Sequence, residues 1–198
     1  MKRLFNILKW SLPAFFILQT GTIFSQNLQF KRSSIKTGIG IGYNEGRDEM
    51  GLGLVYSIGW QKSYGTKNKF RINPNITCGN FSTRVITDVR DQLYKITTFE
   101  LNIAYDFIKY KEFAFVAKIG AFTDYTRGLF GTGGWHQNYH NSAYFYYIYY
   151  GINSSLSLRI DSPKSRFAYE LRGINIYFGN KDFALGYLML EIDYKFIK

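Results

Sequence analysis

Alternation of side-chain character constrains this chain more than any other feature. Between Ser34 and Tyr43, isoleucine, threonine or tyrosine stands at every second position, with lysine or glycine in between. Neighbouring side chains of a strand point to opposite faces of a sheet, so a period of two predicts a β-strand. Eight segments show the pattern to differing degrees: Ser34–Tyr43, Gly51–Tyr64, Phe70–Phe81, Gln92–Lys109, Phe113–Arg127, Ser142–Ile160, Arg166–Phe178 and Phe183–Phe196. The seventh changes phase near Gly173, which predicts a β-bulge.

The connections between these segments form two groups that alternate along the chain. One group is short and comprises residues 65–69, 111–112 and 161–165; the other comprises 44–50, 83–91, 128–141 and 179–182. This order predicts an eight-stranded antiparallel up-and-down barrel, in which an even strand count brings both termini to one end. If the termini are periplasmic, the short group faces the periplasm and the other group faces outside.

The N-terminus has the layout of a secretory signal peptide. Three basic residues stand among the first nine, an apolar run spans Leu12 to Leu18, and Ser25 precedes Gln26. A permanent anchor is the alternative, but this run is shorter than the roughly 20 apolar residues of a spanning helix. We predict a cleaved signal peptide over residues 1–25, a short segment over 26–33 and one barrel domain over 34–198.

Small residues decide which face of the strands is inside. A soluble lipid-binding barrel would show the same period with its faces exchanged. Glycines would weaken strands on an exposed face but fit the crowded lumen of a narrow barrel, and the polar face holds Gly38, Gly40, Gly42, Gly53, Gly59, Gly120 and Gly151. The bulky face supplies aromatic residues for the two girdles of a bilayer span, namely Tyr43, Trp60, Phe107, Phe113, Tyr194 and Phe196. We therefore predict a transmembrane barrel in the cell outer membrane.

Charged residues on the polar face are expected to line the lumen. They carry both signs, so they can pair and offset the cost of burying a charge. The predicted polar lumen network consists of Lys36, Glu100, Asp106, Lys118, Asp124, Arg159, Glu170, Arg172, Glu191 and Asp193.

The signal-like N-terminus, the eight alternating segments and the closing sequence from Glu191 to Phe196 resemble the small OmpA/OmpX-type outer-membrane β-barrels. The resemblance covers essentially all of Ser34 to Lys198. It implies a last strand that the barrel-assembly machinery recognises. Such barrels usually end on the aromatic residue itself, whereas Ile197 and Lys198 follow Phe196 in this chain.

Composition and spacing exclude several other classes. The formal net charge of +11 falls to +8 without the three cations of the signal, which does not predict nucleic-acid binding. The only cysteine, Cys78, rules out an intramolecular disulfide and is expected to face lipid. His136 and His140 could share a metal only on a helix, which the surrounding glycines disfavour. The Gly38–Gly42 segment lacks the strand-to-helix context of a nucleotide loop, so we expect no cofactor.

Eight strands enclose a space just wide enough to be filled by side chains, so porin activity is not expected. The simplest function is that of a structural or surface protein. The fourth to sixth segments exceed the about 9 to 11 residues that cross the hydrocarbon layer, so they could project and offer an edge to a partner. We expect Phe81–Lys95 and Tyr125–Tyr147 to form an extracellular platform for adhesion or for a protein partner; irregular loops are the alternative. Four basic residues are expected near the outer rim of the barrel, where they would contact lipopolysaccharide phosphates or solvent. They are Arg84, Arg90, Arg127 and Lys181.

An enzymatic alternative rests on two residues at the end of the 128–141 connection. His140 and Ser142 look like the His-x-Ser pair of outer-membrane lipid A deacylases, in which the histidine activates the serine for acyl transfer. Those enzymes also need an acidic residue downstream, and Ala143–Ile160 contains none. The predicted function is therefore a non-enzymatic surface role, with deacylation as the second hypothesis.

Overall fold

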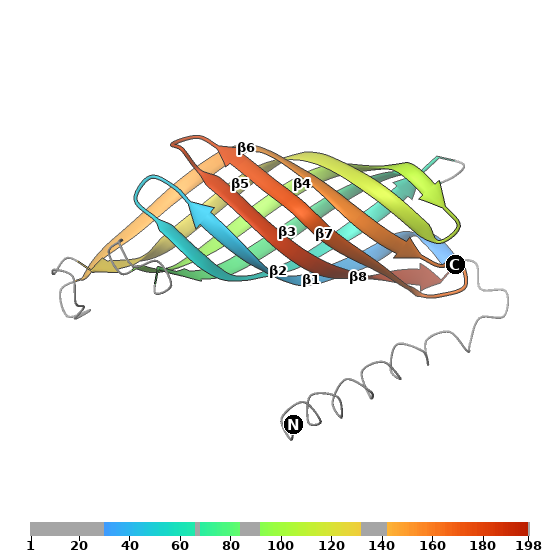
Figure 1. Ribbon diagram of the computed structural model, residues 1–198, viewed down its shortest axis with the longest axis horizontal. Coiled ribbons are helices and arrows are strands. Elements are labelled where there is room, and N and C mark those ends of the chain that lie inside the picture. Colours follow the sequence, from blue (N-terminus) through green and yellow to red (C-terminus); the bar gives the residue numbers. More distant parts are fainter. Residues whose placement is uncertain (1–29, 66–67, 84–91, 132–141, 198) are drawn as a thin grey trace, which may run out of the picture.

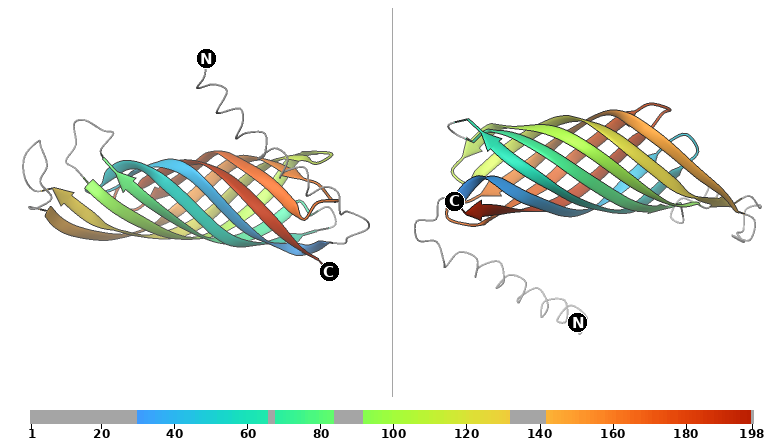
Figure 2. Two further views of the ribbon diagram at one scale, coloured as in Figure 1. Left: turned by 90° about the horizontal axis from the view of Figure 1, so that it is seen from below. Right: turned by 180° about the vertical axis from the view of Figure 1, so that it is seen from behind.

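The structure is a computed structural model that describes residues 30–65, 68–83, 92–131 and 142–197. These residues form one closed antiparallel barrel in which each strand pairs with its neighbours in sequence and β1 pairs with β8 (Figures 1 and 2). The strands are β1 (Phe30–Glu45), β2 (Met50–Tyr64), β3 (Phe70–Ser82), β4 (Gln92–Tyr110), β5 (Phe113–Gly131), β6 (Ser142–Asp161), β7 (Phe167–Gly179) and β8 (Ala184–Ile197). The predicted eight-stranded fold is confirmed, whereas the signal peptide predicted over residues 1–25 lies outside the described residues.

The strand boundaries differ from the sequence prediction by at most four residues. β1 begins at Phe30 instead of Ser34, so part of the expected 26–33 segment belongs to the barrel wall. β5 continues to Gly131 because it stays paired with β6 up to Ser142. These differences lengthen the barrel but leave the order of strands unchanged.

The β-bulge predicted in the seventh strand is present. Along the β7–β8 ladder, Arg172 pairs with Met189, and the next pair is Ile176 with Gly186. Residues 173–175 therefore have no partner in β8. Such an insertion bends the strand and interrupts its ladder.

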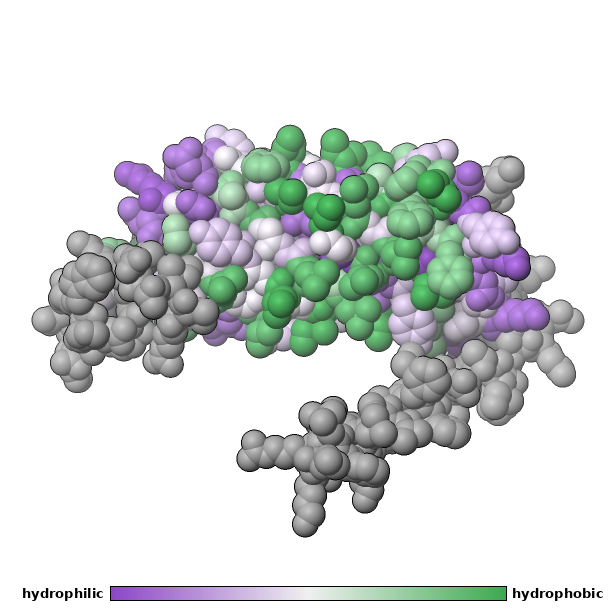
Figure 3. Space-filling model, viewed as in Figure 1, coloured by the Kyte–Doolittle hydropathy of each residue, from purple (hydrophilic) through white to green (hydrophobic). Residues whose placement is uncertain are grey.

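Side chains alternate between the lumen and the outer surface. In β1, Lys36 is fully buried, whereas Ile39 and Ile41 are 55% and 61% exposed on the outside. On the face shown in Figure 3, apolar residues form a broad central band and hydrophilic residues gather toward the two ends. An outer wall of this kind matches lipid, so the orientation of the faces is that of a membrane barrel. Cys78 is exposed on the same outer surface, and no helix within the described segments is long and apolar enough to cross a membrane.

The barrel wall is uneven at the end opposite the C-terminus, which we call the outer end. β5 and β6 have 19 and 20 residues, whereas β7 has 13. The hairpin of β5 and β6 consequently extends beyond the β1–β2 and β7–β8 hairpins (Figure 1). The tight β7–β8 turn, in which Lys181 and Asp182 have positive φ angles of 57° and 62°, ends β7 early.

Candidate functional site

Charged side chains form a continuous ion-pair network inside the barrel. The Lys36 ammonium of β1 lies 2.6 Å from the Glu170 carboxylate and 3.0 Å from that of Glu191. Lys118 of β5 pairs with Glu170 as well and lies 3.4 Å from Glu191. All four residues are at most 5% exposed. Two lysines on distant strands thus share two glutamates, which ties the walls of the lumen together.

Two arginines complete this network. Arg172 binds Glu191 at two points, because its Nε and Nη2 each lie 2.8 Å from one carboxylate oxygen. Arg159 pairs with Asp193 and lies 3.4 Å from Glu170. Arginine suits such sites because its planar fork matches a carboxylate. We call the following seven residues the charged layer: Lys36, Lys118, Arg159, Glu170, Arg172, Glu191 and Asp193.

Asp106 belongs to a separate pair that the sequence analysis did not identify. Arg71 of β3 lies 2.6 Å and 3.0 Å from the two Asp106 carboxylate oxygens, and both residues are buried. The sequence pattern could have predicted an inward-facing Arg71, because the polar residues Arg71, Asn73 and Asn75 occupy every second position of β3. These three residues point into the lumen.

Glu100 and Asp124 are held by neutral donors. Glu100 accepts hydrogen bonds from the Thr77 hydroxyl at 2.5 Å and from the Asn102 amide at 2.9 Å. Asp124 accepts from two threonine hydroxyls, at 2.5 and 2.6 Å. The ten predicted lumen residues are therefore all buried, but only seven of them meet in one network.

A second layer, closer to the outer end, is apolar and largely aromatic. Tyr149 stacks on Phe183 at a centroid distance of 4.5 Å, and Phe122 lies against both Phe183 and Tyr177. We call this cluster of buried residues the aromatic layer: Val55, Phe81, Tyr94, Ile96, Phe122, Phe145, Tyr149, Tyr177, Phe183, Leu185, Tyr187 and Met189. The lumen is thus not uniformly polar: this cluster is apolar, although Asp124, which pairs with Tyr149 in the β5–β6 register, is buried beside it. Aromatic side chains there occupy the inward positions as well as the outward ones.

The glycines of the polar face explain how these rings fit inside a narrow barrel. Gly128 faces Tyr94 in the β4–β5 register, and a Cβ at residue 128 would approach the Tyr94 Cβ to 2.3 Å. Gly79 similarly leaves space for the Phe81 ring. A lumen-facing glycine beside a large aromatic residue on the same face was the sequence signal for the aromatic layer. The side chains of both layers thus lie buried inside the barrel.

Side chains of β4 and β6 form hydrogen bonds with the β1–β2 turn at the outer end of the barrel. The Tyr147 hydroxyl donates to the Asp48 carboxylate, and the Tyr149 hydroxyl accepts from the Arg47 N–H at 3.2 Å. The Gln92 amide of β4 donates to the Asp48 carbonyl oxygen at 2.7 Å. Hydrogen bonds therefore connect the β1–β2 turn to the outer ends of β4 and β6.

One carboxyl group is enclosed beneath this turn. Glu49 is 1% exposed, and its Oε2 accepts a hydrogen bond from the Asp48 N–H at 3.3 Å. Burial raises the pKa of Glu49 above the ordinary carboxyl value, although a hydrogen bond with Tyr149 partly opposes the shift. The outer mouth thus contains an acid whose charged form is disfavoured.

The projecting part of β6 has an unpaired side. The last pair between β6 and β7 is Gly151 with Gly179. Asn180 then caps Tyr150, because its side-chain oxygen accepts from the Tyr150 N–H at 2.9 Å and its own N–H donates to the Tyr150 carbonyl at 3.0 Å. Beyond Tyr150, no described residue pairs with this side of β6. We call Ser142–Tyr149 the free edge.

Tyrosines cover the outward face of the free edge. Tyr144 and Tyr146 are 59% and 64% exposed, with ring centroids 6.3 Å apart. Arg127 of β5 is exposed beside them, opposite Tyr146 in the register. The segments expected to form a platform therefore include a projecting sheet, within residues 92–95, 125–131 and 142–147.

The candidate catalytic, metal-binding and rim residues lie outside the two lumen layers. Ser142 begins β6 opposite Gly131, but His140 lies outside the described residues, so the proposed His-x-Ser geometry does too. His136 and two rim arginines, Arg84 and Arg90, also lie outside them. Lys181 is exposed in the β7–β8 turn. Within the described segments, no group of three metal-binding side chains gathers.

Comparison with known proteins identifies the fold. No protein-family model and no curated protein sequence matches the chain. Neisserial surface protein A is similar in structure, with 14% identity, a TM-score of 0.54, and coverage of 85% of this chain and 99% of that one. The attachment invasion locus protein Ail of Yersinia pestis gives 13% identity, a TM-score of 0.55 and coverage of 85% and 100%. The structure of Ail in complex with the heparin analogue sucrose octasulfate has 12% sequence identity to this chain and a TM-score of 0.55. The match covers 83% of this chain and 97% of that one.

The chain therefore has the fold of the small eight-stranded outer-membrane β-barrels, as the sequence resemblance implied. Within its described residues, this barrel has a charged layer and an aromatic layer in the lumen, and the paired ends of β5 and β6 project beyond β7.

Proposed function

We propose that this protein is an outer-membrane surface protein that binds an extracellular protein partner by strand addition to the free edge of β6. The observation that carries this proposal is the difference in height between β6 and β7, which leaves Ser142–Tyr149 unpaired on one side within the described residues. An exposed edge is a template for pairing with another chain.

The backbone geometry indicates which groups a partner would use. In an antiparallel ladder, the N–H and C=O of one residue point to the same side, and this side alternates along the strand. Tyr150 directs both groups toward Asn180. Tyr144, Tyr146 and Ile148 consequently direct theirs toward the open side.

The side chains of the same three residues would supply contact area. Tyr144, Tyr146 and Ile148 are 54–64% exposed on the outer surface. Tyrosine offers a large and rigid contact surface together with a polar hydroxyl, which is why it is enriched at protein interfaces. A strand placed along the free edge would therefore gain backbone hydrogen bonds and aromatic contacts together.

The rest of the barrel keeps this edge in place. β5 pairs with β6 along its whole projecting part, up to Gly131 and Ser142. Tyr147 and Tyr149, on the inward face of the edge strand, hold the β1–β2 turn. Because side chains of the charged layer and the aromatic layer occupy the described part of the lumen, we place the proposed contact on the outer surface. The fold is compatible with such a role, since Ail, by its name an attachment protein, has a similar structure.

Substitutions at Tyr146 test the proposal. Tyr146→Pro removes one N–H from the open side without removing a bond to β5, and proline is tolerated at strand edges. Tyr146→Ala removes the ring and keeps the N–H. Purified barrel in lipid vesicles would be tested against an array of purified extracellular proteins. A partner that uses the edge should bind the proline variant about fivefold or more weakly than the alanine variant.

Equal binding of the two variants, or no binding by the unmodified barrel, would refute strand addition. Heat-modifiable gel mobility would first establish that both variants are folded.

A further inference from the structure

Exposed cations surround the end of the barrel that carries the C-terminus, which we call the inner end. They stand on β1, β2 and β4, in the β4–β5 turn and in the β6–β7 turn. These elements are spread around the closed strand order, so the positive charge is not confined to one side. We call the following residues the cationic ring: Arg32, Lys62, Lys109, Lys111, Lys164 and Arg166.

The protein itself does not neutralise this ring. Every buried lysine and arginine of the described residues forms an ion pair, whereas no member of the cationic ring forms one with a described residue. Glu112 is the one exposed carboxylate among the described residues of this end, and it accepts a hydrogen bond from the Ser162 hydroxyl at 2.7 Å. Asp161 is 26% exposed and already pairs with Arg159 and Lys195. Negative charge to balance the ring must therefore come from outside the chain.

The excess of cations is a property of the inner end alone. At the outer end, exposed charges of both signs are mixed within the described segments. The cations there are Arg47, Lys95, Arg127 and Lys181, and the acids are Glu45, Asp48 and Asp182.

Two lysines of the ring lie against aromatic residues of the outer wall. The Lys62 Nζ is 5.5 Å from the centroid of the Tyr64 ring, and the Lys111 Nζ is 5.4 Å from that of Tyr110. Both tyrosines are exposed. Such aromatic residues mark the level of the lipid headgroups, and a lysine beside them can lay its stem along the wall and extend its ammonium to a phosphate. The ring therefore lies at the level of the lipid phosphates.

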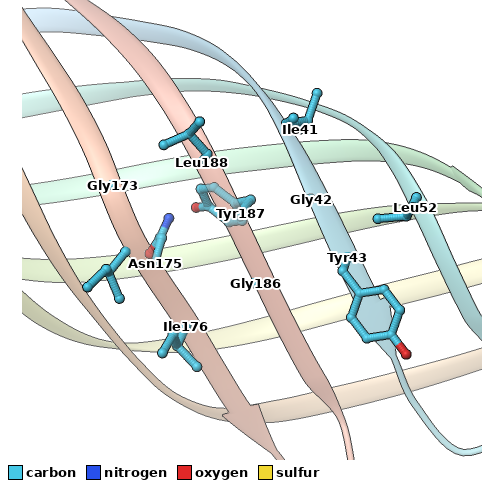
Figure 4. A pocket seen from close by; sticks show the side chains of 11 residues that line it. Ile41, Gly42, Tyr43, Leu52, Gly173, Asn175, Ile176, Gly186, Tyr187 and Leu188 are labelled. Carbon is cyan, nitrogen blue, oxygen red and sulfur yellow. The ribbon is translucent and has the colours of Figure 1, made fainter.

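The apolar wall between the two ends cannot select a lipid by its headgroup. A groove on this wall, near the outer end, is lined by apolar side chains such as Ile41, Leu52 and Leu188 and by no charged residue (Figure 4). Acyl chains can contact such a surface whatever headgroup they carry. Selection by headgroup charge must therefore come from the ends of the barrel.

The inner end also indicates which leaflet the ring meets. In outer-membrane barrels the short turns face the periplasm, and the connections at this end are the short ones, residues 65–69, 111–112 and 162–166. The periplasmic leaflet consists of phospholipids. Among these, an acidic lipid carries a net negative charge that a cluster of lysines and arginines attracts, whereas a zwitterionic lipid does not.

We propose that the cationic ring binds the headgroups of acidic phospholipids in the periplasmic leaflet. The ammonium and guanidinium groups pair with the lipid phosphates, and the neighbouring tyrosines contact the upper part of the acyl chains. The barrel thus collects an acidic lipid shell at its inner end. This contact is independent of the free edge of β6, which lies at the opposite end.

Native mass spectrometry of the detergent-purified full barrel tests the ring. The probes are phosphatidylglycerol and phosphatidylethanolamine with identical acyl chains, and the unmodified barrel should retain phosphatidylglycerol preferentially. The double variant Lys62→Gln with Lys111→Gln should lower this preference by about fivefold or more, since removal of one lysine from a charged lipid surface weakens the attraction roughly fivefold. The preference should also fall at about 1 M salt, which screens charges beyond roughly 3 Å.

The matched control is Lys95→Gln with Lys181→Gln, which removes the same charge from exposed positions at the outer end. It should keep the preference of the unmodified barrel, and heat-modifiable gel mobility would establish that both double variants are folded. Equal losses in the two double variants would overturn the proposal, as would a preference that salt leaves unchanged.

Purified peptidoglycan is the further probe, because its stem peptides carry carboxylates in the same compartment. Absence of a preference for phosphatidylglycerol would overturn the lipid proposal. If the barrel then sedimented with peptidoglycan only when Lys62 and Lys111 were present, the ring would be a cell-wall contact instead.

Discussion

Gly42 of β1 lies directly opposite Tyr187 of β8, and a Cβ at residue 42 would come within 2.8 Å of the Tyr187 Cβ. It would also come within 2.8 Å of the Gly186 carbonyl oxygen. The glycine therefore makes room for a ring of the aromatic layer, and the two positions are coupled through the β1–β8 ladder.

Gly42→Ala should destabilise the barrel by about 1–3 kcal/mol, the usual cost of overpacking a filled interior. Reversible urea unfolding in lipid vesicles measures the change. Gly186→Ala is the control, because its Cβ would point outward into open space, and its stability should not change measurably. Equal losses in the two variants would contradict the steric explanation.

Lys36→Met should destabilise the barrel by about 3–5 kcal/mol, because it leaves buried carboxylates with fewer cations. The charge of an exposed lysine contributes little, so Lys109→Met serves as the control and should have almost no effect. The midpoint of heat modifiability on gels would rank the variants. An unchanged midpoint for Lys36→Met would show that Lys118 and the arginines suffice.

Phe183→Ala should destabilise the barrel by about 3–5 kcal/mol, because it removes a buried ring that stacks on Tyr149. Phe178→Ala deletes the same side chain from a residue that is 59% exposed to lipid. Since lipid can replace the lost contacts there, the loss should be smaller. Comparison of the two unfolding free energies therefore separates the aromatic layer from the outer wall.

Glu49→Gln should stabilise the barrel at neutral pH and reduce the dependence of stability on pH. The pKa of Glu49 is raised by burial, so the folded state binds this proton more tightly than the unfolded state. Protonated Glu49 stabilises the folded state fully at pH values below the ordinary carboxyl pKa. This stabilisation is lost as the pH rises through the raised pKa of the folded state. Unfolding midpoints measured from pH 4.5 upward check this. Glu112→Gln, which alters an exposed carboxylate at the other end, should keep the original dependence.

The fold was predictable from sequence because lipid contact enforces strict alternation over most of the strands. The segment from Phe99 to Phe107 keeps its phase without interruption, and β4 begins at Gln92 and ends at Tyr110, within one residue of the prediction. The bulge near Gly173 was also visible, since a change of phase is a local property of the sequence.

The arrangement of side chains inside the lumen was harder to predict from the sequence. Period two shows that Glu170 and Asp106 point inward, but their partners depend on distances between strands that are far apart in sequence. The aromatic layer was missed because β6 carries aromatic residues on both faces from Tyr144 to Tyr150, so the two faces look alike.

The cap that Asn180 places on Tyr150 limits the size of what the free edge can accept. Ser142–Tyr149 offers roughly 26 Å of backbone, at about 3.3 Å per residue. An incoming strand cannot continue past Tyr149 toward the membrane because the β7–β8 turn occupies that position, so the cap would fix where the paired part of a bound peptide stops.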